Sequence, residues 1–527
     1  MTKPAVNRAI LTVAIVPLLL VGTLVRLAPL TSERRTVAAI SEDGYLMLTV
    51  ARNVALGRSL TIADGTIATN GVQPFVTFVW AGVHWLFASE RLPALRAVVL
   101  VQFSVALLTA VLVAMLTRHA FRDHPWRESA ALVAAALWFA SPLALRHTSN
   151  GLETGFYVCA IAAFLVIDLR WRGKSVFRAA ILGAMLGMLF LIRNDAVFFI
   201  LAFLLAELRG DNQDVPRTIG RRLADSAVVG VAALAVALPW LAYNFQVFGH
   251  IVPVSGRAQN LNLALGENLV ALPRVLGEFA WMAAPLPAKL GESWPWAFVT
   301  CLVVVGAIAA TRQRGRMAGL MLQRWMMIVL VHSALLCAYY GVFFGAAYFL
   351  SRYLFPLSLV AVLIPCIWVI PTARAALSER SDGVKAGLLI AAGLMLLVTI
   401  AAGRLYARSA EHDHGQVVQW VSDHVTPEVW VGAPQSGTLG YFHDRTINLD
   451  GKVNLHALQA RRDNRLFQYI VDDTPIEYIA DWYGLARWVD RPDTVHEERD
   501  VDLLRRHFTV VVREPERNLV VLRRNSR

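Results

Sequence analysis

The sequence predicts a polytopic α-helical membrane protein, with about eleven spans plus interfacial helices and a small α/β domain at its C-terminal end. Composition is the first sign, because 56% of the 527 residues are hydrophobic and 17% are charged, whereas soluble domains have about 45–50% apolar and about 25% charged residues. Long apolar runs are the second sign, since about twenty such residues cross a bilayer. The third is a change after residue 402, where short apolar stretches alternate with polar turns.

Basic loops predict the orientation of the spans, because Lys and Arg stay on the cytoplasmic side. These loops are 118–127, 170–178, 209–222, 312–324 and 374–385. Counting from them places the N-terminus in the cytoplasm and puts the first loop, 31–71, and a later loop, 244–293, on the outer face. Residues 1–402 are then the membrane domain, and residues 403–527 are an extracytoplasmic domain.

The formal net charge of +12 has the same explanation. A basic protein can bind nucleic acid, but here the basic residues collect in short loops between apolar runs, where membrane orientation requires them. We therefore expect membrane lipid, and no nucleic acid, among the partners.

The membrane domain is expected to begin with an uncleaved span at Ile10–Leu30, because its apolar run is too long for a signal peptide. In the first outer loop Ser41 suits a helix cap, and a short amphipathic helix is predicted over Tyr45–Leu56. Val72–Ala88 is apolar but short, and a crossing there would place the basic loop 118–127 on the wrong side. We therefore expect an interfacial or partly inserted helix.

A break is expected within the long apolar run Ala179–Leu208, at Arg193-Asn194-Asp195. As one span, this run would put the basic loop 209–222 outside. Two half-spans that meet at the outer face preserve the charge rule. Broken helices in membranes often mark cavities or sites.

The C-terminal region is expected to form strands and helices of a small α/β domain. The expected strands are Val429–Ala433, Thr438–Phe442, Thr446–Leu449, Phe508–Arg513 and Leu519–Arg523, with a helix over Leu455–Ile470. His412-Asp413-His414 is interpreted as an exposed cluster, too short for a metal site. The glycines of Gly437–Gly440 lack a dinucleotide-binding fingerprint.

Two acidic positions on the outer face are candidates for chemistry. Asp43, next to Glu42, is suited to act as a general base on a hydroxyl, but the pair is also suited to cap a helix. Glu153 follows His147 in the next outer loop and stands at the start of a span, where an unpaired carboxylate is costly. It is expected to cap that helix or to take part in a site.

Two arginines are candidates for holding an anion. Arg193, at the helix break, suits an anionic head group, and the alternative is an internal ion pair with Asp195. Arg352, next to Tyr353, interrupts a long apolar run. It is expected either to reach lipid phosphate at the interface or to bind the phosphate of a substrate.

Charge parity places the acidic pair, Glu153 and both arginines on one face of the membrane. A carboxylate base and cations that hold phosphate suit the transfer of a group from a phosphate-linked donor to a hydroxyl. Cytosolic nucleotides are absent from that face, so a lipid-phosphate carrier is the expected donor.

Several short motifs carry a family resemblance. They are Glu42-Asp43 with Ala51-Arg52-Asn53 and Gly57, Asn70-Gly71-Val72-Gln73-Pro74, Ser149-Asn150-Gly151-Leu152-Glu153-Thr154, Leu191-Ile192-Arg193-Asn194-Asp195, and Tyr441-Phe442 through Asn448-Leu449-Asp450-Gly451. Together they resemble the GT-C superfamily of integral-membrane glycosyltransferases, which use polyprenyl-phosphate sugars, and within it a bacterial arabinofuranosyltransferase-like subgroup. Asn194 stands where that subgroup usually has proline.

The resemblance implies a reaction and roles for its main residues. Asp43 would be the base for an acceptor hydroxyl on a cell-envelope glycan, glycolipid or protein, in a single displacement that inverts the sugar. Arg352 and Arg193 would hold the leaving phosphate. Glu153 would assist the acceptor, tune Asp43 or bind an ion, and Arg52 would position Asp43 by pairing with it.

Further residues would bind or position the substrate. They are Glu42, Asn70, Gln73, His147, Asp195 and Tyr353. No Asp-x-Asp motif is present and no metal ligand is assigned, so a divalent metal ion stays an open alternative. The resemblance also implies the inner (plasma) membrane of a bacterium as the location.

Two other function classes are compatible with parts of the pattern. A transporter or flippase of a lipid-linked saccharide or an anionic substrate also uses cations and broken helices, but no internal repeat is found here. A scaffold whose outer domain recruits partners would leave the acidic first loop unexplained.

Overall fold

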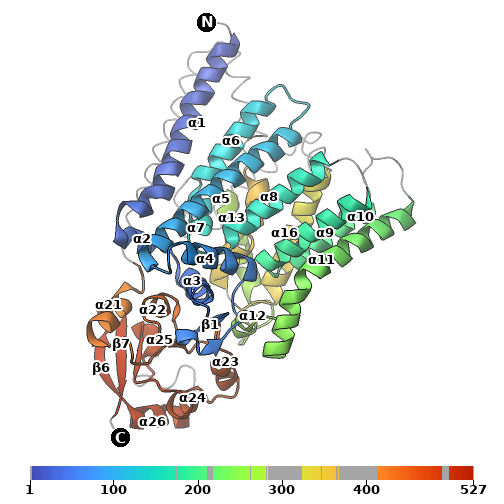
Figure 1. Ribbon diagram of the computed structural model, residues 1–527. Coiled ribbons are helices and arrows are strands. Elements are labelled where there is room, and N and C mark those ends of the chain that lie inside the picture. Colours follow the sequence, from blue (N-terminus) through green and yellow to red (C-terminus); the bar gives the residue numbers. More distant parts are fainter. Residues whose placement is uncertain are drawn as a thin grey trace.

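The computed structural model in Figure 1 shows a bundle of helices with a five-stranded sheet and its own helices at one end. The described residues are 3–171, 175–209, 218–261, 263–280, 282, 323–345, 347–363, 366, 412–488 and 498–525. The expected last span at 386–402, the basic loop 374–385, most of the basic loop 312–324, the boundary at residue 403 and residues 283–293 of the expected outer loop 244–293 lie outside them.

Helices make up nearly all of the described membrane region. The first are α1 (Lys3–Leu27), α2 (Glu33–Ala39), α3 (Glu42–Ala55), α4 (Pro74–Leu86), α5 (Arg91–Ala120), α6 (Arg127–Ala140) and α7 (Pro142–Thr148). The next are α8 (Thr154–Arg170), α9 (Val176–Ile192), α10 (Ala196–Arg209), α11 (Ile219–Phe248), α12 (Val254–Gln259), α13 (Leu272–Ala280), α16 (Arg324–Val342), α17 (Leu350–Tyr353) and α18 (Ser358–Ala361).

Three described helices, α5, α11 and α16, are long and apolar enough to cross a membrane, and two bent pairs raise the number to five. The bent pairs join α1 to α2 at 116° and α6 to α7 at 59°. The expectation of about eleven crossings stays a prediction. The short apolar helix α4 has 13 residues, so it is about 20 Å long and does not reach across a hydrocarbon core of about 30 Å.

The expected break after α9 is confirmed. Arg193 has extended backbone angles, with φ −153° and ψ 129°, so α9 ends at Ile192 and α10 begins at Ala196. The helix expected in the first loop is also confirmed as α3, which starts directly after its cap, Ser41.

The C-terminal unit, defined here as the described residues from 412 to 525, contains one mixed sheet. Its strands are β3 (Val431–Ala433), β4 (Thr446–Asn448), β5 (Tyr478–Asp481), β6 (Phe508–Glu514) and β7 (Leu519–Arg524), in the order β4-β3-β5-β7-β6. Strand β3 is parallel to β4 and β5, whereas β7 is antiparallel to both β5 and β6. Its helices are α21 (Gly415–His424), α22 (Gly437–Phe442), α23 (Leu455–Arg462), α24 (Leu466–Asp472), α25 (Tyr483–Ala486) and α26 (Glu498–His507).

Two expectations for this unit are wrong. The expected strand Thr438–Phe442 is the helix α22, because the carboxylate of Glu42 accepts the backbone N–H groups at its start. The single helix expected over Leu455–Ile470 is two helices, because Asn464 takes a left-handed conformation with φ 53° and ends the first. Local patterns do not predict strand β5 or the helices α21, α25 and α26.

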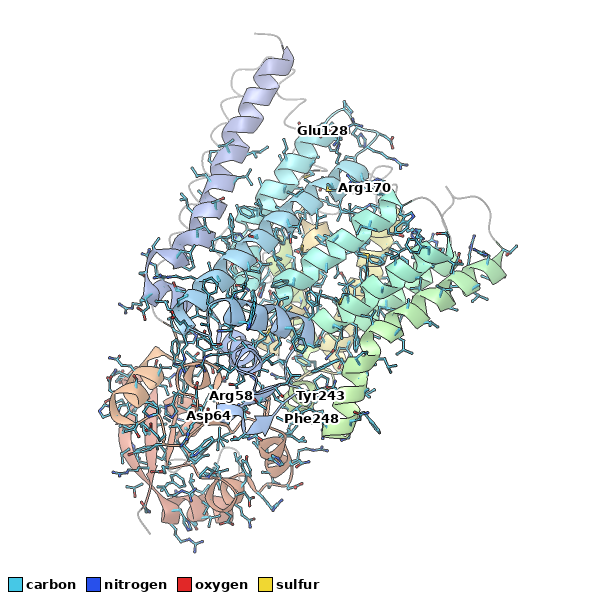
Figure 2. The ribbon with its side chains drawn as sticks, viewed as in Figure 1. Arg58, Asp64, Glu128, Arg170, Tyr243 and Phe248 are labelled. Atoms are coloured by element: carbon cyan, nitrogen blue, oxygen red, sulfur yellow. The ribbon has the colours of Figure 1, made fainter. Side chains whose placement is uncertain are left out.

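A short hairpin in the first loop joins the bundle to the C-terminal unit. Its strands are β1 (Thr61–Ile62) and β2 (Ile67–Ala68). At its turn Asp64 pairs with Arg58 at 2.8 Å and with Arg445 at 3.5 Å. Figure 2 shows Arg58 and Asp64 beside the C-terminal strands. The hairpin therefore contacts the sheet through charged side chains.

Candidate functional site

Asp43 lies in the first turn of α3, and both local sequence and one tertiary contact place that turn. The hydroxyl oxygen of Ser41 accepts the N–H of Gly44 at 3.1 Å, which caps the helix. The backbone N–H and the hydroxyl of Ser41 both donate to the carbonyl of Asn150 at 3.0 Å. A side chain at Gly44 would collide with that carbonyl, and Gly151 next to it has φ +85°. The loop after α7 therefore packs directly on the start of α3.

Both carboxylate oxygens of Asp43 face cations. Arg352 donates to Oδ2 at 2.9 Å, and the ammonium of Lys452 lies 3.5 Å from Oδ1. Burial raises the pKa of Asp43, but the charges of Lys452 and Arg352 lower it more, so the pKa is about 2. Burial lowers the pKa of Lys452, but Asp43 and Asp450 raise it above its usual value. At neutral pH Asp43 and Lys452 are therefore both charged.

Asp43 lines a cavity of about 470 Å³. The acids and cations in its lining are Asp43, Glu153, Asp195, Arg193, Arg352 and Lys452. The remaining wall is largely apolar and aromatic, and includes Leu46, Met47, Phe190, Phe198, Leu241, Tyr339, Tyr340 and Phe344. Val197, Ile251 and Val252 also line it and are at least half exposed, so the apolar wall continues to the surface of the bundle.

Arg193 is only 2% exposed, and its charge is matched within the chain. It pairs with Asp195 and lies 4.0 Å from a carboxylate oxygen of Glu153. The hydroxyl of Tyr340 donates to Asp195 at 2.8 Å, and the ring of Tyr353 lies 5.1 Å from the guanidinium of Arg193. The internal ion pair, one of the two alternatives for this turn, is therefore present.

Several polar atoms in the cavity wall have no hydrogen-bond partner among the described residues. They are Nε of Arg352, Oε1 of Gln73, and the Oδ1 atoms of Asn194, Asp195 and Asn260. One donor and four acceptors in a cavity that is otherwise largely apolar suit a ligand with both anionic and hydroxyl groups.

Lys452 is a site residue that sequence reasoning missed. It stands in the turn after β4, where the side chain of Asn448 accepts the N–H of Gly451 at 2.9 Å and Asp450 accepts the N–H of Lys452 at 2.8 Å. The Asn-Leu-Asp-Gly motif directly before it was a signal of a tight turn. Its position beside Asp43, 409 residues earlier, depends on tertiary structure.

The expected pairing of Arg52 with Asp43 is wrong. Arg52 donates instead to Asp444 of the C-terminal unit at 2.8 Å, and Arg91 donates to the same carboxylate oxygen at 2.8 Å. The helical period explains this difference, because residues nine positions apart on a helix lie on different sides of it. Asp444 therefore joins the first loop and α5 to the C-terminal unit.

Glu42 faces the C-terminal unit and does not line the cavity. It accepts hydrogen bonds from the backbone N–H groups of Gly437 and Thr438, the second at 3.0 Å. Burial raises the pKa of Glu42 more than these hydrogen bonds lower it. These adjacent residues of α3 therefore have different partners. Glu42 contacts the C-terminal unit, whereas Asp43 lines the cavity.

The cluster His412-Asp413-His414 is not exposed as a whole, which corrects the expectation. His414 is fully buried and hydrogen-bonds Asp481 at 2.8 Å, and its other ring nitrogen lies 3.5 Å from Glu42. Burial lowers the pKa of His414 to about 4. This histidine therefore lies between Glu42 and the end of β5.

Two other expected site residues are buried outside the cavity lining. Asn70 donates to Asn244 at 3.1 Å and accepts the N–H of Val254 at 2.9 Å, so it joins the first loop to α11 and α12. His147 hydrogen-bonds the hydroxyl of Ser351 at 3.0 Å, directly before Arg352. Both hold the wall of the cavity in place.

The acids of the cavity do not fit a resident metal ion. Both oxygens of Asp43 already face cations, and Asp195 pairs with Arg193. Within the described ranges, no three His, Cys, Asp or Glu side chains lie together as a metal-binding group. The local positive charge comes from side chains.

Comparisons with known proteins agree with the fold. The family model "Domain of unknown function (DUF8728)" matches residues 402–518. No curated protein sequence matches the chain. ArnT from Cupriavidus metallidurans, bound to undecaprenyl phosphate, is similar in structure with a TM-score of 0.57 and 13% identity, over 97% of this chain and 98% of that chain.

The oligosaccharyltransferase of Archaeoglobus fulgidus, in its apo form, has a TM-score of 0.58 at 12% identity, over 95% of this chain and 73% of that chain. Its AglB structure in complex with an inhibitory peptide and a dolichol-phosphate has a TM-score of 0.53 at 13% identity, over 96% of this chain and 73% of that chain. These neighbours are GT-C glycosyltransferases, so the chain has the GT-C fold that its motifs resemble.

Proposed function

We propose that this protein is a glycosyltransferase that acts at the outer face of the inner membrane. It would move a sugar from a polyprenyl-phosphate donor to a hydroxyl of a cell-envelope glycan, glycolipid or protein. The cavity around Asp43 carries the proposal, because it joins a carboxylate and two cations to an apolar, aromatic wall that reaches the surface of the bundle. A sugar phosphate on a long lipid has the same division into a charged head and an apolar chain. In the same fold, ArnT is described with undecaprenyl phosphate and AglB with a dolichol-phosphate.

In the proposed reaction Asp43 is the general base. The acceptor oxygen forms a bond to the anomeric carbon while its proton passes to Asp43. The bond between the anomeric carbon and the phosphate oxygen breaks, and its electron pair stays on the phosphate. The attack comes from the face opposite the leaving group, so the anomeric centre is inverted.

Arg352 and Lys452 would hold the leaving phosphate. Its charge grows as the glycosidic bond breaks, so contacts from these two cations strengthen in the transition state and raise the rate. Arg193 takes a supporting role in this proposal, because its own charge is matched and it lies 3.5 Å from the carbonyl of Arg352. Tyr353 completes this support by stacking on Tyr340 at 4.2 Å.

Donor binding would also activate the base. A pKa of about 2 makes Asp43 a weak base. A phosphate between Arg352 and Lys452 adds a negative charge and shares their positive charge, and both effects raise the pKa of Asp43. The base would therefore become effective once the donor is in place.

The test is a transfer assay with the full chain in liposomes, radiolabelled polyprenyl-phosphate sugars and cell-envelope extract. Asp43→Asn keeps the shape of the side chain but not the base, so transfer should fall by at least about a hundredfold in protein that still folds. Asp123→Asn is the control, because its side chain is 88% exposed. Near-normal transfer by Asp43→Asn would contradict the base assignment, and movement of labelled lipid without any glycosyl product would favour a transporter.

A further inference from the structure

A second cleft, of about 530 Å³, lies between the first-loop hairpin and the C-terminal unit. Thr66 and Ile67 of the hairpin form one side, and α23 and α24 form another. It has no lining residue in common with the Asp43 cavity. We infer that this cleft binds a saccharide, namely the part of the acceptor glycan that lies away from the reacting hydroxyl, and the inference rests on the glycosyl transfer proposed above.

The lining of the cleft has the chemistry of a neutral sugar site. Its aromatic and polar members are Trp430, Tyr469, His456, Gln459, Arg465 and Asp473. Aromatic rings pack on the apolar C–H face of a sugar, while amide, imidazole and carboxylate groups pair with its hydroxyls. A volume of this size is in the range of small-molecule sites.

Three of the polar side chains are available to a ligand. His456, Gln459 and Asp473 are exposed, and none makes a side-chain hydrogen bond or ion pair within the part of the chain that the structure describes. The aromatic residues are held in place instead. The hydroxyl of Tyr469 accepts from Asn454 at 3.1 Å, and the guanidinium of Arg445 lies 5.5 Å from the ring of Trp430.

Other ligand classes fit this lining less well. Arg465 and Asp473 contribute one charge of each sign, and Arg465 is also 3.6 Å from Asp463, so the cleft has no excess positive charge for a phosphate. A lipid chain would remove water from the polar groups on α23 and α24 without offering them hydrogen bonds, which costs free energy. A neutral compound with many hydroxyls uses both the rings and the polar groups.

Two chain segments connect the cleft to the Asp43 cavity. Thr66 lines the cleft and Gln73 lines the cavity, and an extended chain of seven residues spans at most about 25 Å. On the other side Lys452 lines the cavity and His456 lines the cleft, four residues apart. These chain lengths limit the separation of the two sites, so a glycan with its terminal hydroxyl at Asp43 is long enough to reach the cleft with its next few sugars.

Binding of free disaccharides to the full chain in detergent tests this inference without turnover. The probes are maltose, cellobiose, arabinobiose and chitobiose, observed by saturation-transfer NMR. At least one should bind, and Asp473→Ala should weaken that binding about three- to tenfold, as for the loss of one hydrogen bond. Trp430→Ala should weaken it more, whereas Trp420→Ala is the matched control, because Trp420 stacks on His424 at 4.7 Å and lies outside the cleft lining.

Because Asp473 is exposed, Asp473→Ala should fold even if Trp430→Ala does not, and it then tests the inference alone. Absence of binding by every disaccharide, or equal binding by wild type and Asp473→Ala, would overturn the inference. In the transfer assay, Asp473→Ala should raise the KM for the acceptor. If the wild type neither transfers nor hydrolyses any donor yet binds a disaccharide through Asp473, the proposed function fails and the saccharide site remains.

Discussion

Lys452 supplies a positive charge to Asp43 from a different part of the chain. It is largely buried, 3.5 Å from Asp43 and 3.7 Å from Asp450. Together with Arg352 it provides two cations at one carboxylate, which is the arrangement needed to hold a phosphate that gains charge. A single residue of the C-terminal unit thus becomes part of the cavity in the bundle.

Replacing Lys452 tests this role at the level of one side chain. Lys452→Met should lower transfer by about a hundredfold, while Lys452→Arg should keep most of it. The pKa of Asp43 should rise from about 2 when the lysine charge is removed. Asp43 acts as a base only when it is ionised. With the higher pKa in Lys452→Met, the loss of transfer rate on acidification should therefore begin at a higher pH than in the wild type. A pH–rate profile measures this, and an acid limb in Lys452→Met that matches the wild type would contradict it.

At the scale of elements, α9 and α11 pack with their backbones unusually close. Gly183 and Gly187 lie on one side of α9, and a Cβ at Gly187 would stand 2.5 Å from the carbonyl oxygen of Ala233. Small residues four positions apart allow such an approach between membrane helices. Because α9 ends beside Arg193, this packing also places one wall of the cavity.

Matched glycine substitutions test the packing of α9 on α11. Alanine is the better helix former by about 1 kcal/mol, so Gly230→Ala on α11, where nothing lies within 4 Å of the added atom, should keep or raise the melting temperature. Gly187→Ala should lower it, because overpacking costs about 1–3 kcal/mol. Equal melting temperatures for the two variants would show that the helices can move apart freely.

At the scale of the whole molecule, charged contacts hold the C-terminal unit on the bundle. The carboxylate of Asp444 accepts hydrogen bonds from Arg52 and Arg91, each at 2.8 Å. The carboxylate of Glu42 accepts a hydrogen bond from a backbone N–H group in the first turn of α22. On the C-terminal unit these contacts are made by Gly437, Thr438 and Asp444, all shortly before the turn that carries Lys452. The position of the C-terminal unit therefore determines whether Lys452 lies in the wall of the cavity.

Asp444→Asn should loosen this junction. It removes the charge that Arg52 and Arg91 share, so hydrogen exchange should increase in 437–452 and transfer should fall, with the sheet itself still folded. Glu128→Gln is the control, because Glu128 is 58% exposed and Figure 2 shows it at the far end of the bundle. Unchanged exchange in Asp444→Asn would mean that apolar contacts alone hold the unit.

Local patterns predicted much of the fold and part of the site. Ser41, the break at Arg193 and strands β4, β6 and β7 follow from capping, charge and alternation within a few residues. The same local reasoning was wrong for Thr438–Phe442, where a distant carboxylate starts a helix.

By itself the sequence predicted a mostly helical membrane protein with charged residues between its apolar runs, because composition, apolar length and charge asymmetry are local properties of the chain. Only the tertiary structure decided which charges meet. In the folded chain Lys452 contacts Asp43, Arg52 pairs with Asp444 rather than with Asp43, and Arg193 pairs with Asp195. Pairing over such separations depends on how helices and sheet pack, and a side chain's partner is selected by the nearest compensating charge in that packing.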